Sequence, residues 1–119
     1  MSIFTTILAS IVAIKHLYIM YLQTFATHSN STSRVFNMAK DELQRKSVTT
    51  LFKNQGIYNG LLAVFLLYGI FTGNLEVTTI FVLFVIGAAG YGAVTSSPKI
   101  LLTPGGPAIL TLISILLFN

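Results

Sequence analysis

The sequence contains no cysteine and very few acidic residues, and both absences narrow the chemistry that the protein can perform. Without cysteine there is no disulfide framework, no thiolate-bound metal and no cysteine nucleophile. The three acidic residues are Asp41, Glu42 and Glu76, and none lies inside a long apolar stretch. This distribution argues against a hydrolase that uses two carboxylates and against a proton exchanger with carboxylates inside the membrane.

The common catalytic signatures are missing as well. The sequence holds no G-x-S-x-G, no H-E-x-x-H and no phosphate-binding glycine loop. The two histidines, His16 and His28, lie in different settings, so we expect no metal and no other cofactor. A nucleophilic triad cannot be assembled. If the protein is an enzyme, His16 is the good candidate for a general acid or base, with Lys15 or Tyr91 as an electrostatic partner.

Charge of either sign is scarce. Charged residues make up 8% of the 119 residues and hydrophobic residues 54%, with a mean hydropathy of +0.80. Soluble domains carry about 25% charged residues, so this chain cannot cover a core of its size with a polar shell. We therefore expect a single integral membrane domain over residues 1–119. The formal net charge of +4 forms no evident folded basic surface, which makes the lipid bilayer the expected partner and not nucleic acid.

Four apolar stretches predict an all-α bundle of transmembrane helices, over residues 3–25, 50–71, 77–94 and 100–118. The first lacks the basic start and the cleavage site of a secretory signal, so we expect it to remain as a permanent span. The fourth contains "PGGP" at residues 104–107. The uninterrupted part that follows would rise only about 18 Å, against a hydrocarbon core of about 30 Å. We therefore expect the fourth helix to be short or broken.

Basic residues in the connections predict the orientation. The first connection carries Arg34, Lys40, Arg45 and Lys46, and the third carries Lys99, whereas the two ends and the second turn carry none. Cytoplasmic loops of membrane proteins are enriched in lysine and arginine. The first loop is therefore expected to be cytoplasmic, with the N- and C-termini outside.

Small residues four positions apart predict close helix packing. Such spacing lets helix backbones approach one another in a membrane, within one chain or across a homodimer. Pairs of this kind include Gly56 with Gly60, Gly69 with Gly73, Ala88 with Gly92, and Ala89 with Ala93.

Several polar side chains lie within the apolar stretches, where a charge at mid-depth costs at least about 2.5 kcal/mol. Helical phase and depth predict that six of them converge on the cytoplasmic half of the bundle, with Lys15 beside them near the middle of the first span. The predicted binding set is Lys15, His16, Gln23, Gln55, Asn59, Tyr91 and Thr95. The alternative is that the amides only bond neighbouring helices together, and that the Lys15 amino group reaches the headgroups.

Four stretches resemble, in order and spacing, a family of small bacterial inner-membrane proteins of unknown function. They are "KHLYIMYLQTF" (15–25), "NQGIYNGLLA" (54–63), "GAAGYGAVT" (87–95) and "KILLTPGGPA" (99–108). The resemblance covers nearly the whole chain and implies four spans in the inner membrane, but no established activity. Positions that match the family pattern are His16, Tyr18, Asn54, Gln55, Tyr58 and Asn59.

The chain departs from that family pattern at three positions. Lys15 and Gln23 stand where the family typically has glutamates, and Pro104 stands where it typically has glutamine. Any chemistry that depends on those acids would therefore be lost, or replaced by the binding of an anionic group.

Three functions remain open at this point. The leading hypothesis is a homodimer that binds or transports a small polar or amphiphilic molecule, such as a lipid, through a polar pocket between helices. The second is a membrane-embedded isomerase that acts on a lipid-like substrate through His16. The third is an accessory subunit whose glycine faces dock on a larger membrane partner.

Overall fold

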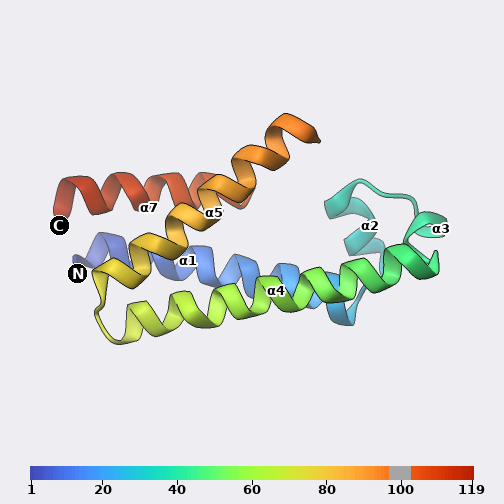
Figure 1. Ribbon diagram of the computed structural model, residues 1–119, viewed down its shortest axis with the longest axis horizontal. Coiled ribbons are helices and arrows are strands. Elements are labelled where there is room, and N and C mark those ends of the chain that lie inside the picture. The colour runs from blue at the N-terminus through green and yellow to red at the C-terminus, as the bar shows by residue number, and fades with distance from the viewer. Residues whose placement is uncertain (97–102) are drawn as a thin grey trace. The chain divides into compact units, whose positions relative to one another are not determined.

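The computed structural model describes residues 1–96 and 103–119, and within these residues all regular structure is helical. Six α-helices and one π-helical segment follow one another within these described residues (Figure 1). They are α1 (Ile3–Met20), η1 (Tyr21–Phe25), α2 (Asn30–Phe36), α3 (Lys40–Leu43), α4 (Lys46–Phe71), α5 (Leu75–Thr95) and α7 (Gly105–Phe118). The expected all-α class is confirmed. Lys99 and the beginning of the expected fourth span lie outside the described residues.

The chain divides into two compact units. The first comprises Met1–Lys15 with Leu62–Asn119, and the second comprises His16–Leu61. The core of the first unit draws on four helices, because α1, α4, α5 and α7 each contribute to it. Its buried members are Val12, Ala13, Leu62, Leu66, Val82, Val85 and Ala108.

A buried polar contact also ties the first unit together. The hydroxyls of Thr5 on α1 and Ser114 on α7 lie 2.7 Å apart, and both residues are buried. The side-chain amide of Asn119 donates to the Thr5 hydroxyl at 2.8 Å. In an apolar core these hydroxyls need partners, so this contact fixes the pairing of α1 with α7.

The connection between α4 and α5 is a three-residue turn closed by backbone hydrogen bonds. Gly73 has a φ of +64°, and its N–H donates to the carbonyl of Ile70 at 3.1 Å. The N–H of Asn74 donates to the carbonyl of Gly69 at 2.8 Å, which completes a Schellman motif. Asn74 then caps α5 by accepting from the Val77 N–H at 3.0 Å. Gly73 therefore supplies a left-handed turn and not the helix-packing contact that its spacing predicts.

Gly69, the partner of Gly73 in the predicted pair, does lie against a neighbouring helix. A Cβ at this position would be 2.8 Å from the Thr78 hydroxyl oxygen and 3.1 Å from the Thr78 nitrogen. In α5, Ala88 is exposed and Gly92 is half-buried. Of these predicted packing residues, Gly69 therefore contacts a neighbouring helix, whereas Gly73 forms a turn and Ala88 is exposed.

The last helix begins earlier than "PGGP" suggests. Pro104 is the N-cap of α7, and Pro107 lies in its first turn. A proline is tolerated there because the first N–H groups of a helix have no intrahelical partner. With 14 residues, α7 rises about 21 Å, so it is short for a span, as expected.

By length and composition, two helical segments can cross a membrane. They are Ile3–Phe25 and Leu75–Thr95, with 28% and 22% of their most apolar windows buried. The other two expected spans do not meet this test, so a four-span bundle is not established. α7 is too short, and the first half of α4 carries Lys53, Asn54 and Asn59 in place of apolar residues.

Candidate functional site

The polar centre of the second unit is built on a change of helix type at the end of α1. In η1 the N–H of Ala26 donates to the carbonyl of Tyr21 at 2.9 Å, five residues back. This wider π turn buries the consecutive residues Leu22 and Gln23 together. Single π turns are rare and are frequent at functional sites.

Gln23 meets a partner on α4. Its side chain is 6% exposed, and the Asn59 side-chain nitrogen donates to its Oε1 at 2.7 Å. A buried amide without a hydrogen bond would cost about 1–3 kcal/mol. The pair therefore fixes η1 against α4, and of the seven predicted binding residues these two are brought into contact.

Two glycines allow the close approach that this hydrogen bond requires. A Cβ on Gly56 would collide with the Thr24 hydroxyl and lie 3.0 Å from both Gln23 Cβ and the Thr24 nitrogen. A Cβ on Gly60 would collide with the Met20 sulfur. We call Gln23, Thr24, Gly56, Asn59 and Gly60 the amide seam.

The amide seam is closed on its outer side by a contact with Lys53. The Thr24 hydroxyl donates to the carbonyl of Lys53 at 3.0 Å, and the Lys53 amino group lies 3.4 Å from the Thr24 carbonyl. Both bonds are exposed. Each links a side chain of one helix to the backbone of the other, six residues before Asn59 along α4.

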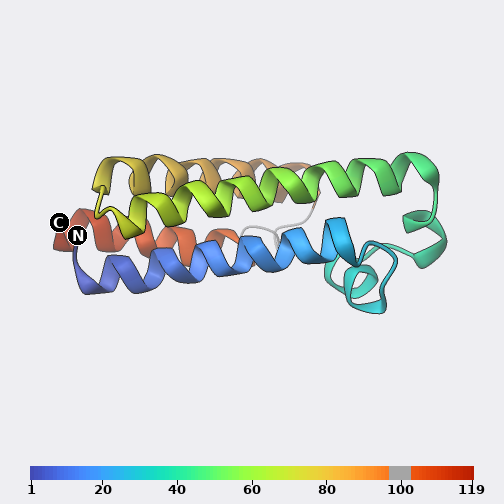
Figure 2. The ribbon, with the colours of Figure 1, turned by 90° about the horizontal axis from the view of Figure 1, so that it is seen from below.

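The polar segment after η1 covers carbonyls at the end of the π turn. α2 packs against η1 and α3, next to the end of η1 (Figure 2). The fully buried Thr32 hydroxyl lies 2.7 Å from the Ala26 carbonyl and 3.0 Å from that of Leu22. Thr27 donates its hydroxyl to the Gln23 carbonyl at 2.7 Å. Carbonyls at a helix end need such partners when they are buried.

Sequence reasoning did not predict a role for Thr32, although a local signal is present. Ser29 caps α2 by accepting from the Thr32 N–H at 3.2 Å, which is a typical N-cap arrangement. The cap places the Thr32 hydroxyl at the end of η1. Nothing in the spacing of the sequence indicates that the π turn exists, so its need for extra partners could not be predicted.

The remaining predicted site residues lie in varied surroundings. His16 is buried in the second unit, at 5% exposed, whereas Gln55 is exposed. Lys15 belongs to the first unit, where its amino group lies 3.4 Å from the Thr103 carbonyl. Tyr91 is also in that unit and is 73% exposed, and its carbonyl accepts the Thr95 hydroxyl at 2.8 Å.

Residues 10–116 match the model of a family described as "Protein of unknown function (DUF1304)". The chain belongs to the DUF1304 family. The uncharacterized protein YpaA of Lactococcus lactis subsp. lactis (strain IL1403) is 57% identical over 116 residues, which cover 96% of this chain and 98% of YpaA. No solved structure matches the chain. The expected membership of a family of unknown function is confirmed.

The DUF1304 match includes the whole of the second unit and therefore every residue of the amide seam. Neither the family description nor the name of the relative assigns an activity, a ligand or a membrane location. In this DUF1304 protein, a function has to be argued from the geometry of the described residues. No group of three or more residues able to hold a metal ion is found among residues 1–96 and 103–119.

Proposed function

We propose that this DUF1304 protein is an integral membrane protein that binds a small polar or amphiphilic molecule at the amide seam. The observation that carries the proposal is the pairing of the buried Gln23 amide in the π turn with the half-buried Asn59 amide on α4, with Asn59 Nδ2 2.7 Å from Gln23 Oε1. An apolar pair would hold the two helices together without the cost of burying amides. Polar groups within apolar helices are expected at functional positions.

The outward faces of the two candidate spans support a membrane location. Large apolar side chains point away from the protein along both, among them Ile14 at 62% exposed, Phe84 at 63% and Val94 at 85%. A helix of the same composition in the core of a soluble protein would bury these side chains. Lipid is the environment in which such a surface is stable.

The hydroxyl groups in the apolar helices are satisfied locally, as lipid requires. Ser10 donates to the Thr6 carbonyl, Thr79 to that of Leu75 and Thr111 to that of Pro107, each at 2.7 Å and four residues back. Side-chain hydroxyls that bond within their own helix expose no unpaired polar group to hydrocarbon. This pattern supports lipid contact for α1 and α5, whereas the Thr111 hydroxyl of α7 is itself fully buried.

We further propose four spans, with the first loop in the cytoplasm. α4 has 26 residues and so rises about 39 Å, more than the hydrocarbon core of about 30 Å. Its polar first half then lies at the cytoplasmic headgroups. α7 rises about 21 Å and would cross by local thinning of the bilayer.

Within the amide seam, the side-chain groups that can still form hydrogen bonds with a ligand belong to Asn59. Asn59 uses one side-chain N–H for Gln23, which leaves a second N–H and Oδ1 on a half-buried residue. Among the described residues, no buried side-chain nitrogen or oxygen lacks a partner. A ligand that offers both a donor and an acceptor, such as an alcohol or amide headgroup, would fit Asn59.

Native mass spectrometry from mild detergent tests this proposal. The wild-type protein is expected to retain a defined adduct, and Asn59→Leu is expected to lower its occupancy about two- to tenfold by removing one or two hydrogen bonds. Gln55→Leu is the matched control, because Gln55 is an exposed amide on the same helix. A wild-type protein without any adduct, or equal loss in both variants, would refute binding at the amide seam and favour a purely structural amide pair.

The same spectra report the assembly state. We propose a homodimer that pairs through α5, where Gly87 and Ala88 are exposed and a Cβ at Gly87 would meet no atom within 4 Å among the described residues. Small exposed residues allow two membrane helices to approach closely. A monomer mass at every detergent concentration would exclude this pairing.

A further inference from the structure

Three tyrosine side chains of the second unit are exposed beside the amide seam. Tyr18 at the end of α1, Tyr21 in η1 and Tyr58 on α4 are 51%, 53% and 70% exposed. The rings of Tyr18 and Tyr21 stack with their centroids 6.5 Å apart. None of the three hydroxyls forms a hydrogen bond with a residue that the structure describes. We call these three residues the tyrosine belt.

The contacts of the amide seam place the tyrosine belt at one level of the two helices. The two glycines of the seam, which precede and follow Tyr58 by two residues, lie against Gln23 and Met20. The level midway between these contacts is that of Tyr21, so Tyr58 and Tyr21 share one depth. Tyr18 lies about 5 Å from that depth along the helix axis. The belt is therefore about as thick as one headgroup layer of a bilayer, about 5–7 Å.

The chemical character of α4 changes at the tyrosine belt. On one side, residues 61–71 carry no charged side chain, and Phe65 and Phe71 are 50% and 83% exposed. On the other side, Lys53 is exposed, and the amides at positions 54 and 55 are exposed as well. The belt thus separates an apolar half of the helix from a polar half.

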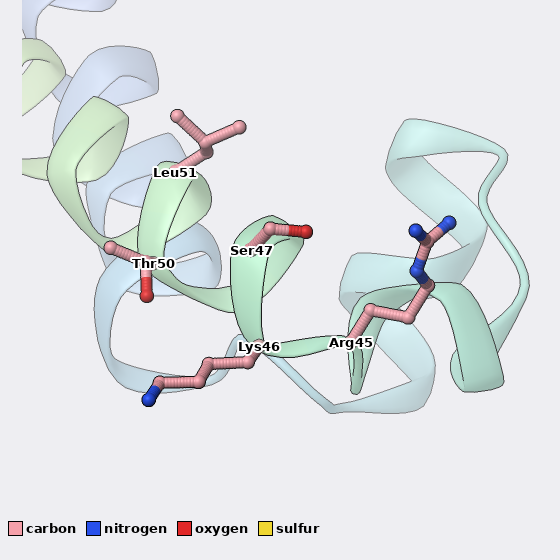
Figure 3. Close-up of a pocket in the computed structure, with 5 residues that line it drawn as sticks. All are labelled: Arg45, Lys46, Ser47, Thr50 and Leu51. Atoms are coloured by element: carbon pink, nitrogen blue, oxygen red, sulfur yellow. The ribbon is translucent and has the colours of Figure 1, made fainter.

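The start of α4, at the far end of the polar half, carries positive charge on two sides. Arg45, Lys46, Ser47, Thr50 and Leu51 line an open hollow there (Figure 3). Figure 3 shows the Arg45 guanidinium and the Lys46 amino group extending to opposite sides. The two cations therefore form no single anion site. Positive charge spread in this way matches a layer of anionic headgroups, which attracts basic residues close to the membrane surface.

We infer that the tyrosine belt docks at the boundary between hydrocarbon and headgroups, on the side of the polar segment between η1 and α4. A tyrosine side chain has an apolar body and a polar tip, and tyrosines are enriched at this boundary. From Tyr58 to Phe71, α4 then rises about 20 Å through hydrocarbon. This length is close to the rise of α7, about 21 Å, so both helices fit a layer thinner than the usual about 30 Å.

This depth selects a class of ligand for the amide seam, and the inference thereby rests on the function proposed above. Asn59 follows Tyr58 directly, so the amide seam lies at the edge of the hydrocarbon and not at its centre. A ligand reaches Asn59 from the headgroup layer. The ligand is a membrane lipid, held through the polar groups next to its acyl chains.

Fluorescence quenching in vesicles tests the depth. The chain contains no tryptophan, so each single-tryptophan variant carries one indole that reports its own position. Leu51, Tyr58 and Phe65 are seven residues apart, on one face of α4 and in steps of about 10 Å along its axis. Leu51 is 66% exposed, which makes it a direct probe of where the hydrocarbon ends. The variants Leu51→Trp, Tyr58→Trp and Phe65→Trp are placed in phosphatidylcholine vesicles brominated either near the glycerol end or near the methyl end of the acyl chains.

The three variants are expected to report three depths. Tyr58→Trp should be quenched more by the shallow bromines and Phe65→Trp more by the deep ones, so the ratio of shallow to deep quenching lies above unity for the first and below it for the second. Leu51→Trp should be quenched by neither. Tyr21→Trp should give the same ratio as Tyr58→Trp. Deep quenching of Tyr58→Trp, strong quenching of Leu51→Trp, or different depths at Tyr21→Trp and Tyr58→Trp would overturn the inference.

The depth and the adduct of the amide seam can fail separately. If the depths are as expected but the wild-type protein carries no adduct in native mass spectrometry, binding at the seam fails and the tyrosine belt stands. If an adduct depends on Asn59 but Tyr58→Trp lies deep in the hydrocarbon, binding stands and the belt is wrong. An adduct with the mass of a water-soluble molecule would overturn the assignment of a lipid ligand.

Discussion

Gly56 provides the sharpest test of the amide seam, because the same substitution should have opposite effects at two glycines. Replacing glycine by alanine inside a helix normally stabilises it by up to about 1 kcal/mol. At Gly56 the new Cβ would collide with the Thr24 hydroxyl and lie 3.0 Å from the Thr24 nitrogen. The hydroxyl can rotate away only by giving up its bond to the Lys53 carbonyl, whereas the backbone nitrogen can move only with η1.

The expected magnitude follows from these contacts. Overpacking costs about 1–3 kcal/mol, and the lost hydrogen bond about 1 kcal/mol, against a helix-propensity gain of about 1 kcal/mol. Gly56→Ala should therefore lower the free energy of unfolding by about 1–3 kcal/mol. In detergent that keeps the protein monomeric, Gly87→Ala should raise it by up to about 1 kcal/mol, because no described atom of the chain lies within 4 Å of a Cβ at Gly87.

The assay is unfolding of the detergent-solubilised protein by increasing sodium dodecyl sulfate, followed by far-ultraviolet circular dichroism. Thr24→Ala in combination with Gly56→Ala should recover part of the loss, since it removes the hydroxyl that collides with the new methyl group. If Gly56→Ala stabilises the protein as Gly87→Ala does, the close approach of η1 and α4 is wrong. The interpretation of the amide seam would fail with it.

Two other predictions concern buried hydroxyls. Thr32→Val should lower the free energy of unfolding by about 1–2 kcal/mol, because it removes the hydroxyl that donates to the Leu22 and Ala26 carbonyls. Amide hydrogen exchange should show the loss of protection within η1 and α2, and unchanged exchange there would contradict the capping role. A double-mutant cycle with Thr5→Val and Ser114→Ala should give a coupling of about 0.6–1.7 kcal/mol, the range for hydrogen bonds between membrane helices, and additive effects would show that the 2.7 Å contact contributes nothing.

The long helices could be predicted from hydropathy and turn residues. The expected first stretch, 3–25, has the same bounds as α1 with η1, and the expected 77–94 differs from α5 by two residues at its start and one at its end. The expected 50–71 ends where α4 ends, but α4 begins at Lys46. Hydropathy does not predict that start, because the first turn of α4 is polar and is formed by local backbone hydrogen bonds.

The candidate site was predicted only in part, and helix geometry explains why. Gln55 and Asn59 are four residues apart, which places them on broadly the same side of a helix. The contact face of α4, however, is centred between Gly56 and Gly60. At about 100° per residue, Asn59 lies about 80° from that centre and Gln55 about 120°. Asn59 therefore reaches Gln23, whereas Gln55 is exposed.

The polar connection shows a second limit of sequence reasoning. The structure contains two short helices there, α2 and α3, separated by residues 37–39, of which Asn37 has a left-handed φ of 51°. The aromatic rings of Phe36 and Phe52 meet edge to face, with centroids 5.2 Å apart. Contacts of this kind join positions far apart in the chain, so local periodicity does not reveal them.

The π turn also determines how this protein can change by insertion and deletion. A π turn holds one residue more than the α-helical turn that would replace it. A single-codon deletion within η1 would therefore convert the π turn into an α-helical turn and keep the residues on either side of it in register. If the deleted residue is Gln23, a neighbour takes its place opposite Asn59, without any substitution. In this part of the chain, a length change in the gene acts as a change in the chemistry of the site.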